Sequence, residues 1–134
     1  MSRLLYMLDT NIVSDLIRNP LGKAAQRTER AGADTVCVSI IVAAELRYGA
    51  AKGKSFRIGD LVEGLLARLP VLPLDMPADA DYAAIRTQLE NAGTPISAND
   101  LLIAAHALAL RMPLVTADSA FRRVSGLQVE NWLE

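Results

Sequence analysis

The hydrophobic positions of this chain follow two periods in alternation, one typical of strands and one typical of helices. Short runs predict strands over Leu4–Leu8, Val36–Ser39, Val71–Leu74, Leu114–Thr116 and Gln128–Asn131. Apolar residues spaced three or four apart predict helices over Asn11–Ile17, Leu21–Ala31, Ile41–Lys52, Phe56–Arg68, Ala78–Ala92 and Asn99–Leu110. Strands that alternate with helices in this way are typical of an α/β fold with a parallel sheet.

The prolines support this division of the chain. They are Pro20, Pro70, Pro73, Pro77, Pro95 and Pro113. None interrupts the interior of a proposed helix, where a proline would remove a hydrogen bond. Gly93 indicates a stop before the last helix, and Ser97 is placed to cap its first turn. No repeat or linker divides the 134 residues, so we expect one domain over residues 1–134.

Composition is that of an ordinary globular protein. Hydrophobic residues make up 51% and charged residues 22% of the chain, a balance that permits a buried core and argues against disorder. The formal charge is only −1. A nucleic-acid partner would therefore have to be held by a local basic patch or through metal ions, because no overall positive field attracts it.

Cysteine usage and the N-terminus bear on cellular location. Cys37 is the only cysteine, which excludes an intrachain disulfide and a cysteine-based zinc site; we interpret it as a buried, inert thiol. The first residues lack the layout of a signal peptide. The longest nearly apolar stretch, Leu101–Leu110, falls short of the ~20 residues of a membrane span. We expect a cytoplasmic protein that makes no membrane contact.

Four acidic residues stand at positions that converge on one edge of the predicted sheet. Asp9 follows the first strand and Asp118 follows the fourth, so both belong at the carboxyl edge, where ligands bind in open α/β sheets. Asp100 begins the last helix, whose N-terminus we place at the same edge. Glu45 falls in the apolar stripe of its helix, where an unpaired carboxylate would be costly.

Each of these acids also has a purely structural interpretation. Asp9, Asp100 and Asp118 are placed to cap helices or turns, and Ser97 with Asp100 has the spacing of a capping box. Glu45 could pair with a buried arginine. Convergence favours a functional site, because four close carboxylates cannot all remain ionised without a counter-charge. Mg²⁺ or Mn²⁺ would supply that charge and can activate water for phosphodiester cleavage.

In these residues the chain resembles the PIN-domain toxins of the VapC type. The matching segments, in order, are Met7–Asn11, Ser39 with Glu45–Gly49, Gly93–Ile96 with Asn99–Ala107, Leu114–Asp118 with Phe121, and Gly126–Trp132. The resemblance spans almost the whole chain. It implies a three-layer α/β/α fold with a central parallel sheet of about five strands. It further implies an Mg²⁺-dependent endoribonuclease, with Mn²⁺ as a substitute, that acts on RNA, is neutralised by a small cognate antitoxin, and forms a homodimer.

The resemblance also assigns residues. Asp9, Glu45, Asp100 and Asp118 match the family's acidic quartet and are the expected catalytic residues, with Asp9, Asp100 and Asp118 as the metal ligands. Thr10 and Thr116 match hydroxyl residues beside that pocket. Two positions depart from the family pattern: many relatives have Asn in place of Asp118, and relatives often have Gly in place of Ser97.

Other polar residues are given structural interpretations first. His106 lies about 120° around its helix from Asp100, so we expect it to point away from the pocket. Asp75, Asp79 and Asp81 follow the third strand and are best explained as helix-capping acids. The basic residues Arg47, Lys52, Lys54 and Arg57 are either a solvated helix end or a phosphate contact. Arg122 and Arg123 are another possible phosphate contact. We predict that Arg86 is partly buried, and it could pair with a site acid or hold a phosphate.

Two other functions compete with the ribonuclease. An aspartyl-phosphate phosphatase is suggested by the Asp9-x-Asn11 spacing, but Asn11 cannot supply a proton and no lysine occurs after Lys54. A catalytically silent binding module would keep the fold without the chemistry. Metal binding that disappears on Asp9→Asn distinguishes an intact site from a silent one.

Overall fold

The computed structural model describes residues 3–134, whose core is a five-stranded parallel sheet. The strands are β1 (Tyr6–Leu8), β2 (Val36–Ser39), β3 (Val71–Leu72), β4 (Leu114–Val115) and β5 (Val129–Glu130). Their order across the sheet is β3-β2-β1-β4-β5, and every neighbouring pair is parallel. Met7 of β1 is in register with Cys37 of β2 on one side and with Leu114 of β4 on the other. The predicted parallel sheet is confirmed.

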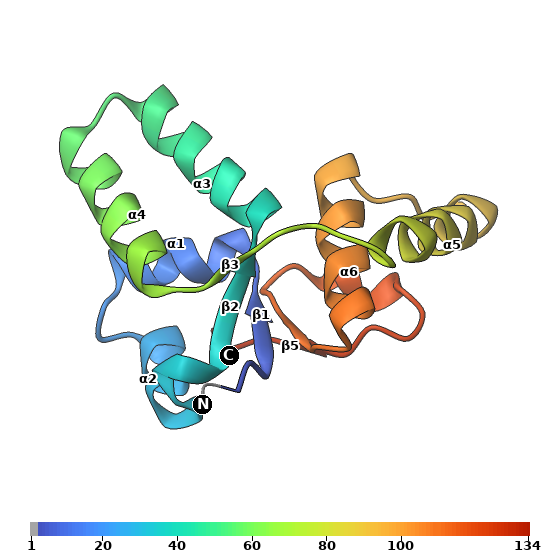
Figure 1. Cartoon of the computed structure of the whole chain (residues 1–134), viewed down its shortest axis with the longest axis horizontal. Coiled ribbons are helices and arrows are strands. Elements are labelled where there is room, and N and C mark those ends of the chain that lie inside the picture. The colour runs from blue at the N-terminus through green and yellow to red at the C-terminus, as the bar shows by residue number, and fades with distance from the viewer. Residues whose placement is uncertain (1–2) are drawn as a thin grey trace.

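Six α-helices cover the two faces of the sheet and complete the expected three layers. They are α1 (Thr10–Arg18), α2 (Lys23–Ala31), α3 (Ile40–Gly53), α4 (Phe56–Arg68), α5 (Ala78–Asn91) and α6 (Ala98–Leu110). Helices α1 to α4 lie on one side of the strands, and α5 and α6 lie on the other (Figure 1). The change of face follows from right-handed crossovers, because the chain moves outward from β1 to β3 and then returns past β1 to β4.

Several element ends differ from the sequence prediction by one to two residues, with local causes. The third strand stops at Leu72 because Pro73 has no N–H for the ladder. Helix α2 begins at Lys23, not at Leu21, because the Gly22 N–H closes a turn onto the Asn19 carbonyl at 2.9 Å. Two short 3₁₀ helices, η1 (Ala33–Thr35) and η2 (Ser119–Arg123), were not predicted.

Serine side chains cap the N-termini of three of the helices. Ser39 accepts a hydrogen bond from the Ile41 N–H at the start of α3, and Ser55 accepts one from Ile58 at the start of α4. Ser97 accepts one from the Asp100 N–H at 3.3 Å and so caps α6 as predicted. Each cap satisfies a backbone donor that the helix itself leaves free.

The hydrophobic core lies on both faces of the central strands. Met7, Leu8 and Leu114 from the sheet are fully buried, and so are Ile12 of α1 and Ile103 of α6. Cys37 is buried and unpaired, and burial raises the pKa of its thiol to about 11, in agreement with an inert thiol. None of the helices within residues 3–134 has both the length and the apolar character that crossing a membrane requires.

Candidate metal and active site

The candidate site lies where the winding of the sheet changes direction. Strand β1 is flanked by β2 on one side and by β4 on the other, and the carboxyl ends of β1 and β4 meet at one edge. Asp9 follows β1 directly, and Thr116 and Asp118 follow β4. This is the switch point at which open α/β sheets bind their ligands. Because β1 pairs directly with β4, the residues that follow these two strands lie next to one another.

Asp9 is the most deeply buried acid of the site. Its carboxylate is only 4% exposed and accepts three hydrogen bonds. The Thr10 N–H donates to Oδ1 at 2.8 Å, while the Thr116 hydroxyl at 2.7 Å and the Asn11 amide at 3.1 Å donate to Oδ2. Burial raises the pKa of Asp9, the bonds from Thr116 and Thr10 lower it, and the charges of Asp100 and Glu45 raise it further.

Glu45 reaches the same edge from α3. The Thr10 hydroxyl donates to its Oε1 at 2.6 Å, and the Asn99 side-chain amide donates to its Oε2 at 3.3 Å. Thr10 therefore serves two acids at once, Asp9 through its backbone N–H and Glu45 through its hydroxyl. The alternative in which Glu45 pairs with a buried arginine is wrong, since its partners are neutral donors.

Asp100 and Asp118 both take part in a cap in addition to their place in the site, Asp100 through its backbone N–H and Asp118 through its carboxylate. Asp100 is half-buried in the first turn of α6; burial raises its pKa, a hydrogen bond with Ser97 lowers it, and the charges of Asp118 and Glu45 raise it. Asp118 is exposed, and its Oδ1 accepts from the Ala120 N–H at 2.9 Å at the start of η2. The structural and functional interpretations of these two residues are thus compatible.

Thr116 and Asn11 tie the site together. The Thr116 hydroxyl donates to Asp9 and accepts both from the Asn11 amide at 3.2 Å and from the Asp118 N–H at 3.0 Å. The Asn11 carbonyl in turn accepts from the Ala117 N–H at 3.0 Å. Asn11 and Asn99 are the site residues whose contacts sequence reasoning missed. Their only signal was adjacency to Asp9 and Asp100.

Among residues 3–134 no cationic side chain forms an ion pair with any of the four acids. Within residues 3–134 the ion pairs join Arg27 to Glu130, Arg47 to Glu63 and Arg86 to Glu90, and none involves a site acid. An all-oxygen, uncompensated donor set is the type that Mg²⁺ and Mn²⁺ prefer, so the residues present fit such an ion.

In the part of the chain that the structure describes, the acidic side chains do not yet surround one common position for a metal ion. Among residues 3–134 no three His, Cys, Asp or Glu side chains are arranged to hold one ion. Hydroxyl and amide groups stand between the carboxylates and hold Asp9 and Glu45. The expectation that Asp9, Asp100 and Asp118 coordinate one metal ion therefore requires them to draw together and stays a prediction.

The remaining sequence candidates lie outside this cluster. His106 is 2% exposed, its Nδ1 lies 2.8 Å from the Ser39 hydroxyl, and none of its hydrogen bonds within residues 3–134 involves a site acid. Arg47 is exposed and bonds Glu63 through two nitrogens at 2.8 and 3.0 Å. The prediction that Arg86 is partly buried is wrong: its side chain is 52% exposed and paired with Glu90. Because its helix stands at the outside of the fold, it contacts no site acid.

Comparison with known proteins gives a consistent result. Residues 6–127 match the family model described as the PIN domain. The chain is 40% identical over 131 residues to ribonuclease VapC2 of Haemophilus influenzae, covering 96% of this chain and 98% of that one. It is 37% identical over 131 residues to the tRNA(fMet)-specific endonuclease VapC of Salmonella typhimurium, covering 95% and 97%. The crystal structure of VapBC2 from Rickettsia felis bound to a promoter DNA fragment has a TM-score of 0.89 at 35% identity, covering 96% of this chain and 99% of that one.

Proposed function

This chain belongs to the PIN-domain family and, within it, to the VapC ribonucleases, and we propose that it hydrolyses RNA phosphodiester bonds with the help of Mg²⁺ or, in its place, Mn²⁺. The observation that carries this proposal is the cluster of four carboxylates at the switch point, which no cationic side chain of residues 3–134 neutralises. All four acids of the family quartet are present, which argues against a silent binding module.

The four acids would have two roles, binding of the cation and activation of the attacking water. Asp9, Asp100 and Asp118 would hold the cation. A divalent ion supplies a Lewis acid that makes water nucleophilic near neutral pH and neutralises the charge that develops on the phosphate. Glu45, fixed on one oxygen by Thr10 and on the other by Asn99, would orient the attacking water and accept its proton.

Neighbouring hydroxyl and amide groups prepare these acids for their roles. Thr116 and Thr10 fix the rotamer of Asp9, so that its remaining lone pairs are directed before a ligand arrives. Asn11 fastens the loop after β4 to the start of α1 through the Ala117 N–H. These contacts act by positioning, because none of these groups can carry the negative charge that the cation requires.

A small antitoxin is the proposed protein partner. The support is that several similar solved structures are VapBC assemblies, from Rickettsia felis and Salmonella typhimurium among others. The homodimer expected from the family resemblance stays a prediction. The Salmonella typhimurium relative is named for a transfer RNA.

Cleavage by purified protein tests the proposal. RNA should be cut in Mg²⁺ or Mn²⁺ and left intact in EDTA, and Asp9→Asn should reduce the rate at least about a hundredfold, since a buried ligand to the cation is neutralised. The matched control is Asp34→Asn, which makes the same change at an exposed position before β2, at the opposite edge of the sheet. Cleavage that persists in EDTA, or an Asp9→Asn protein as active as the control, would refute the mechanism.

A further inference from the structure

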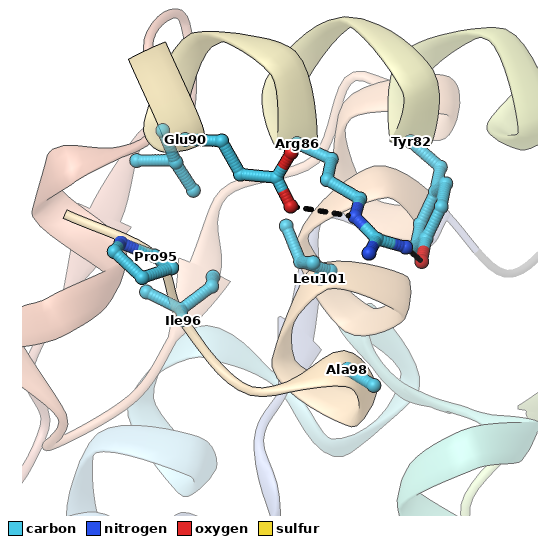
Figure 2. Close-up of a pocket in the computed structure, with 8 residues that line it drawn as sticks. Tyr82, Arg86, Glu90, Pro95, Ile96, Ala98 and Leu101 are labelled. Atoms are coloured by element: carbon cyan, nitrogen blue, oxygen red, sulfur yellow. Dashed lines mark hydrogen bonds and ion pairs between the residues drawn. The ribbon is translucent and has the colours of Figure 1, made fainter. Parts of the chain in front are cut away.

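A hollow separate from the acid cluster lies between α5 and the first turn of α6. Its volume is about 120 Å³. The polar side chains of its wall are Tyr82, Arg86 and Glu90, and its apolar wall includes Pro95, Ile96 and Leu101 (Figure 2). A cavity of ~150 Å³ in a protein core is large enough to admit benzene. The hollow is somewhat smaller than that, but it is open to solvent, so a planar ring can lie partly inside it and partly outside.

The polar wall of the hollow is held in a fixed arrangement. Arg86 donates through Nε to Glu90 Oε2 at 3.0 Å and through Nη1 to the Tyr82 hydroxyl at 2.9 Å. The guanidinium carbon lies 5.9 Å from the centroid of the Tyr82 ring. Three side chains from successive turns of α5 thus form one hydrogen-bonded unit, with Arg86 between its two partners (Figure 2).

This unit retains unused donors and an unused acceptor. A guanidinium has five N–H groups, and only two of those on Arg86 are engaged within residues 3–134. Over the same residues Glu90 uses Oε2 alone. The hollow therefore offers a donor and an acceptor side by side, above an apolar floor. A phosphate group would meet the carboxylate of Glu90, whereas the edge of a nucleobase carries acceptors and donors next to one another.

We propose that the hollow binds one unstacked nucleobase of the RNA substrate, with its edge on Arg86 and Glu90 and its face against the apolar wall. Its role rests on the proposed function, since it requires an RNA strand at the acid cluster. The first turn of α6 separates the two places: Ala98 lines the hollow, while Asn99 and Asp100 face the acids. The hollow and the acid cluster are therefore separated by one helix width, about 10 Å. The bound base would belong to a nucleotide close to the one that is cut.

Binding of base-bearing and base-free strands tests this assignment. The probes are fluorescein-labelled single-stranded RNA dodecamers of A, of C and of U, together with an abasic dodecamer that keeps every ribose and phosphate. Affinities are measured by fluorescence anisotropy in Mg²⁺ with Asp9→Asn protein, which prevents cleavage, and again with the unaltered chain in EDTA. At least one base-bearing strand should bind about tenfold more tightly than the abasic strand.

Substitutions in the hollow should remove this preference. Arg86→Leu should weaken binding of the preferred strand about tenfold and leave the abasic strand within about twofold. Glu90→Gln, which keeps the size of the side chain, should also reduce the preference. The matched control is Arg30→Leu, at an exposed arginine of α2. Helix α2 lies far from α5 (Figure 1). It makes the same change of charge and should leave the base preference unchanged.

Two results would overturn the nucleobase assignment. One is equal affinity for all four strands. The other is an Arg86→Leu protein that loses as much affinity for the abasic strand as for the others, which would make Arg86 a phosphate contact. Metal-dependent cleavage by the unaltered chain, followed in parallel, keeps the two proposals apart. Cleavage without a base preference refutes the nucleobase assignment alone. A base preference without cleavage refutes the metal-dependent mechanism alone.

Discussion

At the scale of single residues, the hydrogen-bond partners of the four acids are neutral groups and not cations. Asp9 has hydroxyl, amide and backbone donors, and Glu45 has a hydroxyl and an amide. Such donors satisfy the carboxylate oxygens without cancelling the charge, which stays available for a cation. In the metal-free protein, burial of the carboxylates raises the pKa values of Asp9 and Asp100, and repulsion between the acids raises them further.

Asp100→Asn should stabilise the metal-free protein, because it relieves this repulsion. A carboxyl group whose pKa is higher in the folded than in the unfolded state destabilises the fold at pH 7. We expect the Tm in EDTA to rise by about 2 °C, a small shift because a half-exposed group is screened. The Tm gain on adding Mn²⁺ should shrink in the variant. Thermal melts in EDTA and in Mn²⁺ measure both effects.

The sign of the pH dependence gives a second readout for Asp100. Since its folded pKa is raised above the ordinary value of 3.8, the destabilisation should fade as pH falls through the raised value toward 3.8. The difference in Tm between variant and unaltered protein should therefore narrow at acidic pH. An Asp100→Asn protein that melts clearly lower in EDTA at pH 7 would show that the carboxylate is needed as part of the α6 cap.

At the scale of elements, one buried histidine joins three of them. His106 of α6 contacts the Ser39 hydroxyl at the end of β2, and it also bonds the backbone of Pro73 just after β3. Ser39 in turn caps α3 through the Ile41 N–H at 3.1 Å. The helix that carries Asp100 is thereby fastened to the helix that carries Glu45. This is the structural role that the sequence predicted for His106, but its partners could not be read from the sequence.

His106 should make the fold sensitive to mild acid. Burial lowers the pKa of His106, and the bond to Pro73 raises it less. Its contribution to stability is therefore complete above the ordinary pKa of 6.5 and is lost as pH falls from 6.5 through the lowered folded value. Between pH 7.5 and 5.5 the unaltered protein should lose stability relative to His106→Gln, whose amide cannot take up a proton. Urea midpoints at several pH values measure the difference.

The acids act in the opposite direction, but both proteins contain them, so the comparison isolates His106. Parallel curves for the two proteins across this range would contradict a lowered pKa. A uniformly lower midpoint for His106→Gln, without a change in slope, would reflect lost packing alone.

At the scale of the whole molecule, the end of the chain closes the fold. Trp132 is 1% exposed and packs against Tyr6, the first residue of β1, with ring centroids 5.1 Å apart and planes at 66°. The Arg27 guanidinium of α2 lies 5.4 Å from the centroid of its ring. The indole N–H donates to Glu130 of β5 at 3.0 Å. One side chain thus joins the first strand, the second helix and the last strand.

Trp132→Ala should lower the free energy of unfolding by about 3–5 kcal/mol, as expected for deletion of a buried aromatic side chain. The measurement is urea unfolding followed by far-UV circular dichroism, because the chain has only 1 tryptophan and fluorescence would lose its probe. Trp132→Phe keeps part of the packing and should lose clearly less. A loss below about 1 kcal/mol for Trp132→Ala would mean that the C-terminal segment is not integral to the core.

The sequence by itself determined the type and order of the elements and the edge to which the acids belong. Local periodicity predicted each α-helix and each strand to within a few residues, because side-chain spacing along a segment reflects its own backbone period. In a parallel sheet every strand ends at the same edge, so Asp9 and Asp118 had to share it. Ser97 as a cap also followed from neighbours only three residues apart.

Only the tertiary structure decided which segments meet. The adjacency of β1 and β4 brings Asp9 within reach of Thr116, 107 positions away, and Asn99 reaches Glu45 across 54 positions. Arg86 was predicted to be partly buried, yet it lies on an exposed face and with Tyr82 and Glu90 forms the wall of a hollow. Such pairings depend on strand order and helix packing, which are set by the whole core and leave no local period in the sequence.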